Sequence, residues 1–407
     1  MDLINKGLSY SKNFLNRKLV GYTKNQYIII MMVLSLFLPY IPGLIILVLG
    51  LIYLLITKQL KEAMNTPLFK NYAFVFSIYS LLVSLFHENL LGAGQSLGMV
   101  VVVFFTAFYR KNVNERLFTF IIDLCCLLSI GCFVYGLFEY AQIVERLGYN
   151  FFDFIIFDAP KDRVEATFFN ANYYAQIIQF IILMCVYKIL NTKKWHRIVY
   201  YASTIFCNLF ALYLTGCRTA WLSFVITIPF MFYVNNYKKT FYCIVGVMGI
   251  AMLALLIKPD LFPRFDSILS SFATRVKIWS TGIEGIKDNP LFGLGPGGYK
   301  LIFEQYGGHL TNHSHNIFIE VVLSFGIIGL LIASKFVVPV IKETIDIIKN
   351  KIDMKLAGLI ICFIITVFIH NFFNYSIFWS QTGLLFIIVL NSTVIYKEEN
   401  QSIEVSS

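Results

Sequence analysis

Long apolar stretches separated by short polar segments run along most of the chain. A helix that crosses a membrane needs roughly 20 apolar residues. The run from Tyr27 to Ile56 is long enough for two short spans hinged at Pro39 and Pro42, and further spans follow near 69–86, 92–109, 117–141, 172–190, 197–215, 219–235, 239–257, 316–340, 355–372 and 377–395. The pattern predicts an all-α, polytopic membrane protein with about twelve transmembrane helices.

Composition supports a membrane protein. Of the 407 residues, 58% are hydrophobic and 14% are charged, whereas a soluble domain carries about 25% charged residues. The net charge of +10 does not indicate nucleic acid, because Lys and Arg stand in short clusters between apolar runs. The eight cysteines lie mostly inside apolar segments and show no spacing typical of a disulfide framework or a zinc site.

Basic residues fall in alternate loops, which predicts the orientation in the membrane. Residues 1–25 are basic and are not followed by a signal-peptide cleavage pattern, so we expect both termini on the cytoplasmic side. Two long segments, 142–171 and 258–315, then face outward, and the second forms a large extracytoplasmic loop between predicted helices nine and ten. The chain divides into a bundle over 1–257, the loop over 258–315, and C-terminal helices with a cytoplasmic tail over 316–407.

Histidines gather on the predicted outer face, near the start of the span at 316–340. His315 lies where that helix begins, and the positive helix end keeps an imidazole neutral, so it can act as a general base. His309 and His313 lie close by, but neither a H-E-x-x-H pattern nor a cysteine partner supports a metal site. Glu320 lies on the same helical face as Asn316. The alternative is that these polar residues simply cap the helix.

Five arginines lie outside the basic clusters and on the outer side: Arg146, Arg163, Arg218, Arg264 and Arg275. Three of them, Arg163, Arg218 and Arg275, are candidates for ligand binding. Arg218 occupies a tight turn between two apolar helices, where it either binds an anion or extends to the membrane interface. Arg275 has Trp279 four residues later, which also allows a simple Arg–Trp stack. Arg163 precedes an asparagine pair that ends at Asn172, and these asparagines could cap the next helix. Because a guanidinium bonds two phosphate oxygens at once, several of them on one face predict an anionic ligand.

A glycine-rich run lies at the centre of the large predicted loop. Gly293, Gly295 and Gly298 match G-x-G-x-x-G, but that pattern indicates a dinucleotide site only between a strand and a helix. Here it follows an Asp-Asn-Pro turn outside the membrane. We therefore expect a loop that bends sharply and lets another group approach its backbone closely.

These motifs together resemble the O-antigen ligase and O-antigen polymerase superfamily of bacterial membrane glycosyltransferases. The resemblance spans roughly Arg163 to Gly329. It rests on FFNANYYA (168–175), TGCRTAW (215–221), the pair Arg275 and Trp279, NPLFGLGPGGY (289–299), and HSHNIFIE (313–320) followed by Gly326 and Gly329. One departure is Cys217, at a position where a small hydroxyl residue or glycine is expected.

The resemblance implies a function at the outer face of the cytoplasmic membrane. The donor would be a glycan on undecaprenyl pyrophosphate. Arg218 and Arg275, with Arg163, would hold the pyrophosphate, His315 would be the base with His313 as its rival, and Asn316, Glu320, Asn172 and Trp279 would support them. No cofactor and no metal would be needed, and a flippase and a chain-length regulator are possible partners. The leading hypothesis is a polymerase of lipid-linked repeat units; the alternatives are a ligase acting on a final acceptor and a transporter of the same lipid.

Overall fold

The computed structural model describes residues 21–396 except 60, 62–64, 66–71, 259–263 and 265–266. The basic segment 1–20 and the tail 397–407, on which the predicted position of the termini depends, lie outside the described residues.

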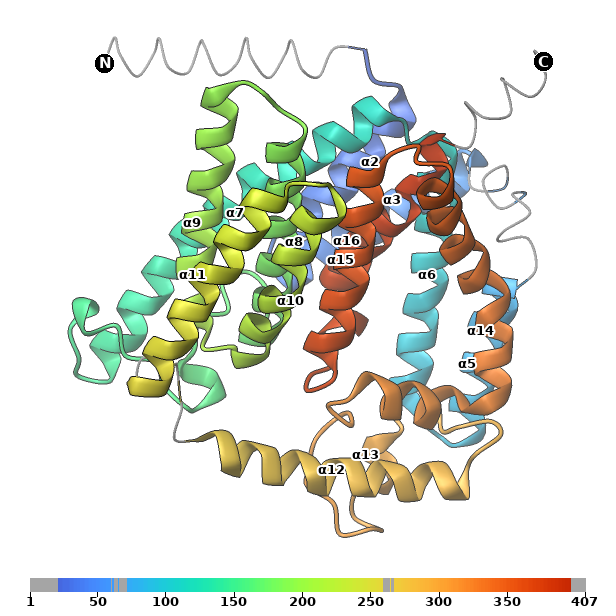
Figure 1. Ribbon diagram of the computed structural model, residues 1–407. Coiled ribbons are helices and arrows are strands. Elements are labelled where there is room, and N and C mark those ends of the chain that lie inside the picture. Colours follow the sequence, from blue (N-terminus) through green and yellow to red (C-terminus); the bar gives the residue numbers. More distant parts are fainter. Residues whose placement is uncertain are drawn as a thin grey trace.

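Every regular element in the described part is helical (Figure 1). The α-helices are α2 (Lys24–Ser35), α3 (Tyr40–Ile56), α5 (Tyr72–Phe86), α6 (Leu90–Asn112), α7 (Glu115–Arg146), α8 (Ala171–Leu190), α9 (Trp195–Thr215), α10 (Arg218–Val234), α11 (Lys238–Ile257), α12 (Ile268–Asp288), α13 (Tyr299–Ile302), α14 (Ile317–Lys349), α15 (Met354–Asn371) and α16 (Ser380–Leu390). Short 3-10 helices are η1 (Phe151–Asp153), η2 (Pro160–Asp162), η5 (Ser376–Phe378) and η6 (Asn391–Tyr396).

Each predicted span contains a helix. Within the described residues, 7 helices are long and apolar enough to cross a membrane: α6, α7, α8, α9, α11, α14 and α15. Four further apolar helices, α3, α5, α10 and α16 with η6, are shorter. The all-helical membrane fold is therefore confirmed, and a count of twelve crossings stays a prediction.

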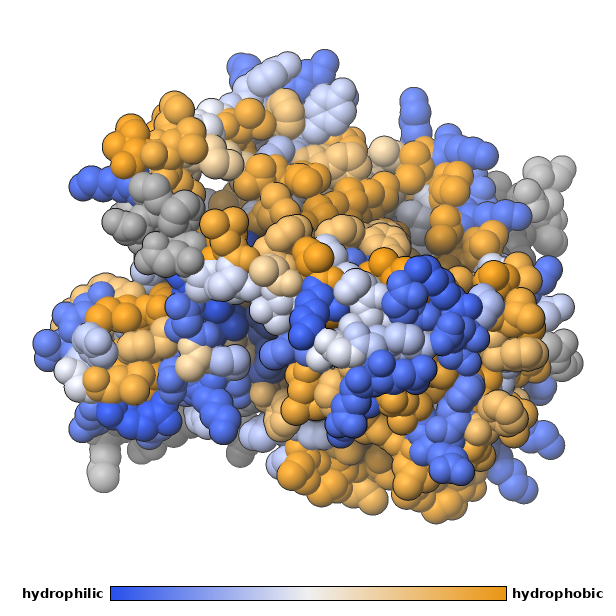
Figure 2. Space-filling model, turned by 90° about the horizontal axis from the view of Figure 1, so that it is seen from below, coloured by the Kyte–Doolittle hydropathy of each residue, from blue (hydrophilic) through white to orange (hydrophobic). Residues whose placement is uncertain are grey.

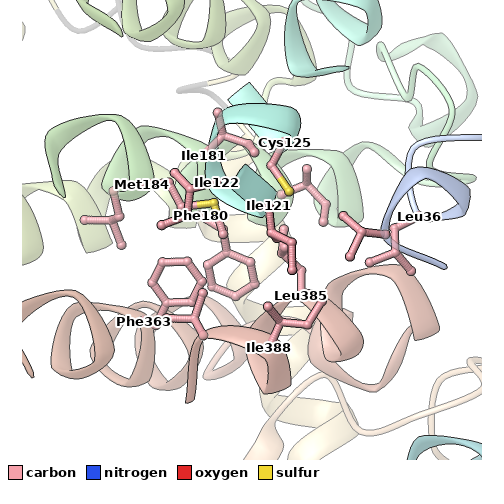
Figure 3. Packing of buried hydrophobic residues seen from close by; sticks show 14 of the residues in the cluster. Leu36, Ile121, Ile122, Cys125, Phe180, Ile181, Met184, Phe363, Leu385 and Ile388 are labelled. Atoms are coloured by element: carbon pink, nitrogen blue, oxygen red, sulfur yellow. The ribbon is translucent and has the colours of Figure 1, made fainter. Parts of the chain in front are cut away.

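Helix α8 forms the centre of the bundle. Its sequence is apolar all round, which is typical of a helix buried on every side, and 89% of its apolar window is buried. Figure 3 shows Phe180 of α8 among side chains of α7, α15 and α16. The rings of Phe180 and Phe363 are stacked with centroids 4.3 Å apart. This packing fixes α8, α10 and α15, whose ends carry several of the candidate residues.

A short turn, residues 36–39, joins α2 to α3. With 12 residues, α2 rises about 18 Å, less than the roughly 30 Å of a hydrocarbon core. Of the two prolines predicted as the hinge, Pro39 is the N-cap residue of α3 and Pro42 lies in the first turn of that helix. Buried Gln381 donates hydrogen bonds to the carbonyls of Leu36 (2.8 Å) and Leu38 (3.0 Å). These two carbonyls have no partner within the helix, and the Gln381 side chain thereby satisfies them.

The predicted outer loop 258–315 contains two helices, α12 and α13. Helix α12 lies across one end of the bundle (Figure 1) and is not among the candidate membrane spans. Figure 2 looks onto this end, where hydrophilic side chains gather in patches among apolar ones. The inner side of α12 packs against α13 and α14 through a small cluster formed by Ile278, Leu294, Tyr299, Ile302 and Leu323. The large loop is thus a folded cap.

The glycine-rich run joins this cap to an interruption in α14. Gly326 interrupts the helix with φ 59° and ψ −175°. The amides of Leu294 and Gly295 donate to the carbonyls of Leu323 and Ser324, and the amides of Ile327 and Ile328 donate to those of Pro290 and Leu291, all at 2.8 to 3.0 Å. The expected close approach to the glycine backbone is confirmed, and the approaching group is the backbone of α14.

Candidate functional site

His313 and His315 lie in the segment that leads from the cap into α14. Asn316 is the N-cap residue, and its side chain accepts hydrogen bonds from the amides of Phe318 (2.9 Å) and Ile319 (3.2 Å). The capping alternative is therefore correct for Asn316. His315 precedes the cap and has a left-handed backbone, with φ 51°. Such a conformation is uncommon for a residue with a Cβ and is often found at functional sites.

Glu320 holds this segment in place. Its side chain is 1% exposed. One carboxylate oxygen accepts the amide of Ser314 at 2.6 Å, and the other accepts the Ser324 hydroxyl at 3.4 Å. Because Ser314 stands between the two histidines, Glu320 fixes the backbone that carries both rings. The sequence proposed Glu320 as a supporting residue, and in the structure it contacts the Ser314 backbone and the Ser324 side chain.

His315 opens onto a cleft of about 320 Å³ lined by Ser271, Thr274, Arg275, Ile278, His309, Leu310, Thr311 and His315. The His315 Nε2 atom lies 3.3 Å from the Thr311 hydroxyl, while the buried Nδ1 atom has no hydrogen-bond partner among the described residues. Burial above all, then the charges of His313, Arg275 and His309, hold the pKa of His315 well below its usual range. The His315 imidazole is therefore neutral near pH 7.

His313 has different surroundings. Its ring stacks on Tyr375 at 4.5 Å and meets the ring of His315 nearly edge-on at 4.2 Å. Burial lowers the pKa of His313 to about 4. His313 is not among the residues that line the cleft. Its ring packs between Tyr375 and His315, and of these two histidines only His315 lines the cleft.

Arg218 connects the bundle to the cap. As the first residue of α10, it donates to the Arg264 carbonyl at 2.6 Å and to the hydroxyls of Ser267 and Ser271 at 3.2 and 3.0 Å. Its guanidinium therefore lies against the start of α12. The same residue Ser271 accepts a hydrogen bond from Arg275 through its carbonyl, at 3.3 Å. Ser271 thus lies between Arg218 and Arg275.

Arg275 faces the cleft from α12. Its Nε donates to the carbonyl of Phe373 at 3.0 Å, and the guanidinium carbon lies 5.9 Å from the Phe373 ring centroid. The Arg–Trp stack considered from the sequence is replaced by this Arg–Phe contact. Trp279 packs edge-on against Phe372 at 5.6 Å. Arg275 therefore owes its position to the loop after α15, about 100 residues away in the sequence.

Arg163 lies on the far side of the turn between α9 and α10. It is 6% exposed and donates to the Thr215 carbonyl at 2.6 Å and to the Asn172 side chain at 3.0 Å. Burial above all lowers its pKa to about 10. Asn170 caps α8 by accepting the Asn172 amide, so the capping alternative is correct for the first asparagine, and Asn172 pairs with Arg163.

Gly216 and a fourth arginine, Arg264, complete the turn between α9 and α10. Gly216 has φ 59°, and a Cβ on it would lie 2.6 Å from Ile156. Cys217 is buried and occupies the N-cap position of α10. Arg264 reaches the Gly216 carbonyl at 3.5 Å and pairs with Asp158 at 2.8 Å. A small residue is thus required at 216, and cysteine at 217 is accommodated.

The structure brings Arg218, Arg275 and His315 to the junction of bundle and cap, with Arg163 behind the Gly216 turn. The sequence singled out these residues but did not select Arg264, Ser271 or Tyr375. Arg264 lies in the loop before α12, and Ser271 lies on α12 together with Arg275. Only the contacts of Arg264 and Ser271 in the structure identify them as part of the candidate site. Among the residues described, no three side chains of metal-ligating type come close enough to hold a metal ion.

Two comparisons with known proteins show what this chain is similar to. Residues 203–334 match the O-antigen ligase family model, a range that includes Arg218, Arg275, His313 and His315 but not Arg163 or Asn172. The chain is also similar to the ComP-specific O-oligosaccharyltransferase of Acinetobacter baylyi (strain ATCC 33305 / BD413 / ADP1), with 23% identity over 376 residues. That alignment covers 84% of this chain and 65% of the relative, so the chain spans just under two thirds of the relative's length. The motifs, the helical membrane fold and these two matches support the resemblance of the chain to the O-antigen ligase superfamily.

Proposed function

We propose that this protein is a ligase-type glycosyltransferase that moves an oligosaccharide from a polyprenyl-diphosphate carrier to a final acceptor at the outer face of a bacterial cytoplasmic membrane. From the sequence, polymerization of repeat units was the leading hypothesis and the ligase was an alternative. The present proposal reverses the rank of these two functions. The family match and the oligosaccharyltransferase relative favour the ligase alternative. Polymerization stays the second candidate, supported by the motifs that both activities share.

One observation carries the proposal: a single cleft is lined by both Arg275 and His315. Transfer from a diphosphate carrier requires two groups. One is a group that binds phosphate, and the other is a neutral imidazole. Arg218 adds a second guanidinium behind the cleft wall, where it donates a hydrogen bond to the lining residue Ser271. A transporter of the same lipid would instead hold its substrate near the membrane midplane, whereas this cleft lies under α12.

In the proposed reaction, the oxygen of an acceptor hydroxyl attacks the anomeric carbon of the donor sugar. His315 takes the hydroxyl proton as the new carbon–oxygen bond forms. The bond between the anomeric carbon and the diphosphate oxygen breaks, and the bonding electrons leave with the diphosphate. Arg218 and Arg275 stabilise the negative charge that develops on this leaving group. The products are the glycosylated acceptor and the polyprenyl diphosphate, and the proton on His315 then passes to solvent.

Arg218 and Arg275 already donate hydrogen bonds to other groups of this protein. Each guanidinium has five N–H donors, so these bonds do not use all of them. The two hydrogen bonds described for Arg275 use its Nε and one terminal nitrogen. These contacts orient the guanidinium before a ligand arrives, which lowers the entropic cost of binding. Arg163 lies behind the turn, and we assign it to the support of Arg218 through Thr215 and Gly216.

Replacement of Arg275 should weaken donor binding. Arg275→Ala removes one or two charge-assisted hydrogen bonds, so we expect the donor dissociation constant to rise at least about tenfold. Arg275→Lys keeps the charge but loses the planar fork and should fall between alanine and wild type. Binding is measured with a polyprenyl-diphosphate-linked oligosaccharide in detergent, together with the thermal unfolding midpoint. Unchanged binding in Arg275→Ala would contradict the assignment, and a loss of binding that follows only a drop in the midpoint would indicate a structural role.

A reconstitution experiment separates the two candidate activities. Purified protein is supplied with the lipid-linked oligosaccharide alone, and then with a distinct acceptor such as a pilin-like protein or a lipid-linked core glycan. A ligase should give product only in the second reaction, with one oligosaccharide added per acceptor site. A ladder of elongated lipid-linked chains in the first reaction would establish the polymerase instead.

A further inference from the structure

A row of aromatic side chains connects the cap to the helices of the bundle. In spatial order, its members are Phe272 and Trp279 of α12, Phe372 at the end of α15, Phe318 of α14 and Phe368 of α15. The ring centroids of successive members lie 5.6 to 6.2 Å apart. Three helices therefore build one continuous apolar surface, which we call the aromatic row.

Most of this surface is exposed. Phe272, Phe318, Phe368 and Phe372 are 48%, 52%, 46% and 40% exposed, respectively. Membrane lipid would cover such rings on α14 and α15, which are long and apolar enough to span a membrane, but α12 is not among the candidate spans. The row thus extends beyond the membrane-spanning helices onto the cap. A contiguous exposed apolar surface of this kind is typical of a binding site.

The row on the cap begins beside Arg275. Arg275 lies three residues after Phe272 and four before Trp279, so the three side chains share one side of α12. The guanidinium carbon lies 5.9 Å from the centroid of the Phe373 ring, and that ring lies 4.9 Å from Phe372 and 5.9 Å from Trp279. Because Arg275 also lines the cleft with His315, the row is continuous with the candidate active site.

The other end of the row lies on the membrane-spanning helices. Phe318 is in the first turn of α14, and Phe368 is in the last turn of α15. Their rings are stacked at 5.6 Å with an angle of 7° between their planes. No member of the row carries a charge. The arrangement therefore fits a ligand with an anionic end in the cleft and a long apolar chain that continues toward the membrane.

We propose that the aromatic row binds the polyprenyl chain of the donor, along the isoprene units next to the diphosphate. This inference rests on the proposed function, which places the diphosphate at Arg275. Contact between the chain and the rings removes apolar surface of both from the surrounding solvent or detergent, and the close packing adds dispersion attraction. A chain held along the row would also orient the diphosphate and the anomeric carbon in the cleft, which is how remote contacts assist transfer.

Two diphosphates that differ in chain length test the proposal. Dissociation constants of undecaprenyl diphosphate and geranyl diphosphate are measured with the detergent-solubilised protein. Wild type should bind the long chain at least about tenfold more tightly than the short one. In Phe368→Ala the long chain should bind about five- to tenfold more weakly, whereas the short chain, which ends before Phe368, should bind as it does to wild type. Phe318→Ala should also weaken binding of the long chain.

Phe206→Ala is the matched control. Phe206 is 73% exposed on α9, which lies on the other side of the bundle from α14 (Figure 1). This variant should bind both diphosphates as wild type does. Because Phe206, Phe318 and Phe368 are all largely exposed, their substitution should leave folding intact, and the thermal unfolding midpoint without ligand checks this.

Three results would overturn the proposal and leave the proposed function in place. One is equal affinity of wild type for the two diphosphates, and another is undiminished binding of the long chain by both Phe318→Ala and Phe368→Ala. The third is an equal loss in Phe368→Ala and Phe206→Ala, which would indicate a general effect of the apolar surface. In all three cases geranyl diphosphate still binds, and Arg275→Ala still weakens its binding. If wild type bound neither diphosphate, the proposed function itself would be contradicted, and this inference with it.

Discussion

His315→Asn should lower the rate of glycosyl transfer by about 10²- to 10⁴-fold while donor binding remains close to that of wild type. Loss of a general base typically costs this much. Asparagine is the suitable replacement because it tolerates the left-handed backbone of position 315, whereas most other residues would add strain. The measurement is the turnover of a lipid-linked donor by the purified variant, together with its donor dissociation constant and its thermal unfolding midpoint.

Two histidine controls make this result specific. His313→Phe keeps an aromatic ring for the stack on Tyr375, so we expect a much smaller loss of turnover. His196→Ala alters an exposed residue at the far end of α9 and should have no effect. If His313→Phe abolished transfer while His315→Asn kept it, the roles of the two residues would be exchanged. Full turnover in both variants would remove the histidines from the chemistry.

Gly326→Ala should destabilise the protein by about 3 kcal/mol or more and lower the unfolding midpoint by about 5 °C. The backbone at Gly326, with φ 59° and ψ −175°, belongs to a region that essentially only glycine adopts. A Cβ there would lie 2.3 Å from the Leu291 carbonyl oxygen, which is backbone and cannot rotate away. The hydrogen bonds between the glycine-rich run and α14 would break, and transfer should fall with them because this junction positions the cap over His315.

Gly98→Ala is the matched control on α6. A Cβ at Gly98 meets no atom within 4 Å, and alanine favours the helix more than glycine does. This variant should therefore be as stable as wild type or slightly more stable. If both glycine substitutions lowered the midpoint equally, the effect would come from the membrane environment and not from the junction.

The sequence predicted the local features of the candidate site well. The helix start at Asn316, the capping role of Asn170, the sharp bends of the glycine-rich run and the helical ranges all follow from residue type and spacing. These features depend on backbone preferences and on neighbours within a few residues, which a single sequence contains.

The groups that the candidate arginines contact could not be predicted in the same way. The sequence suggested Trp279 as the stacking partner of Arg275, because helical spacing brings those residues together, but the guanidinium lies on Phe373. For Arg218 the sequence left open anion binding and extension to the membrane interface, and in the structure its guanidinium donates hydrogen bonds to the start of α12. Both contacts join segments between 40 and 100 residues apart in the sequence, so they depend on how whole helices pack.

The sequence by itself therefore determined that this chain is a helical membrane protein, that its glycines form a tight loop, and which arginines and histidines are candidates for chemistry. Hydrophobic length and local backbone preference decide these properties. Only the tertiary structure decided that the loop pairs with the interrupted helix α14, that Arg275 and His315 share one cleft, and that His313 packs on Tyr375 beside it. Such contacts arise when the bundle and the cap close on each other, and residue spacing along one segment does not specify the neighbour that packing brings to it.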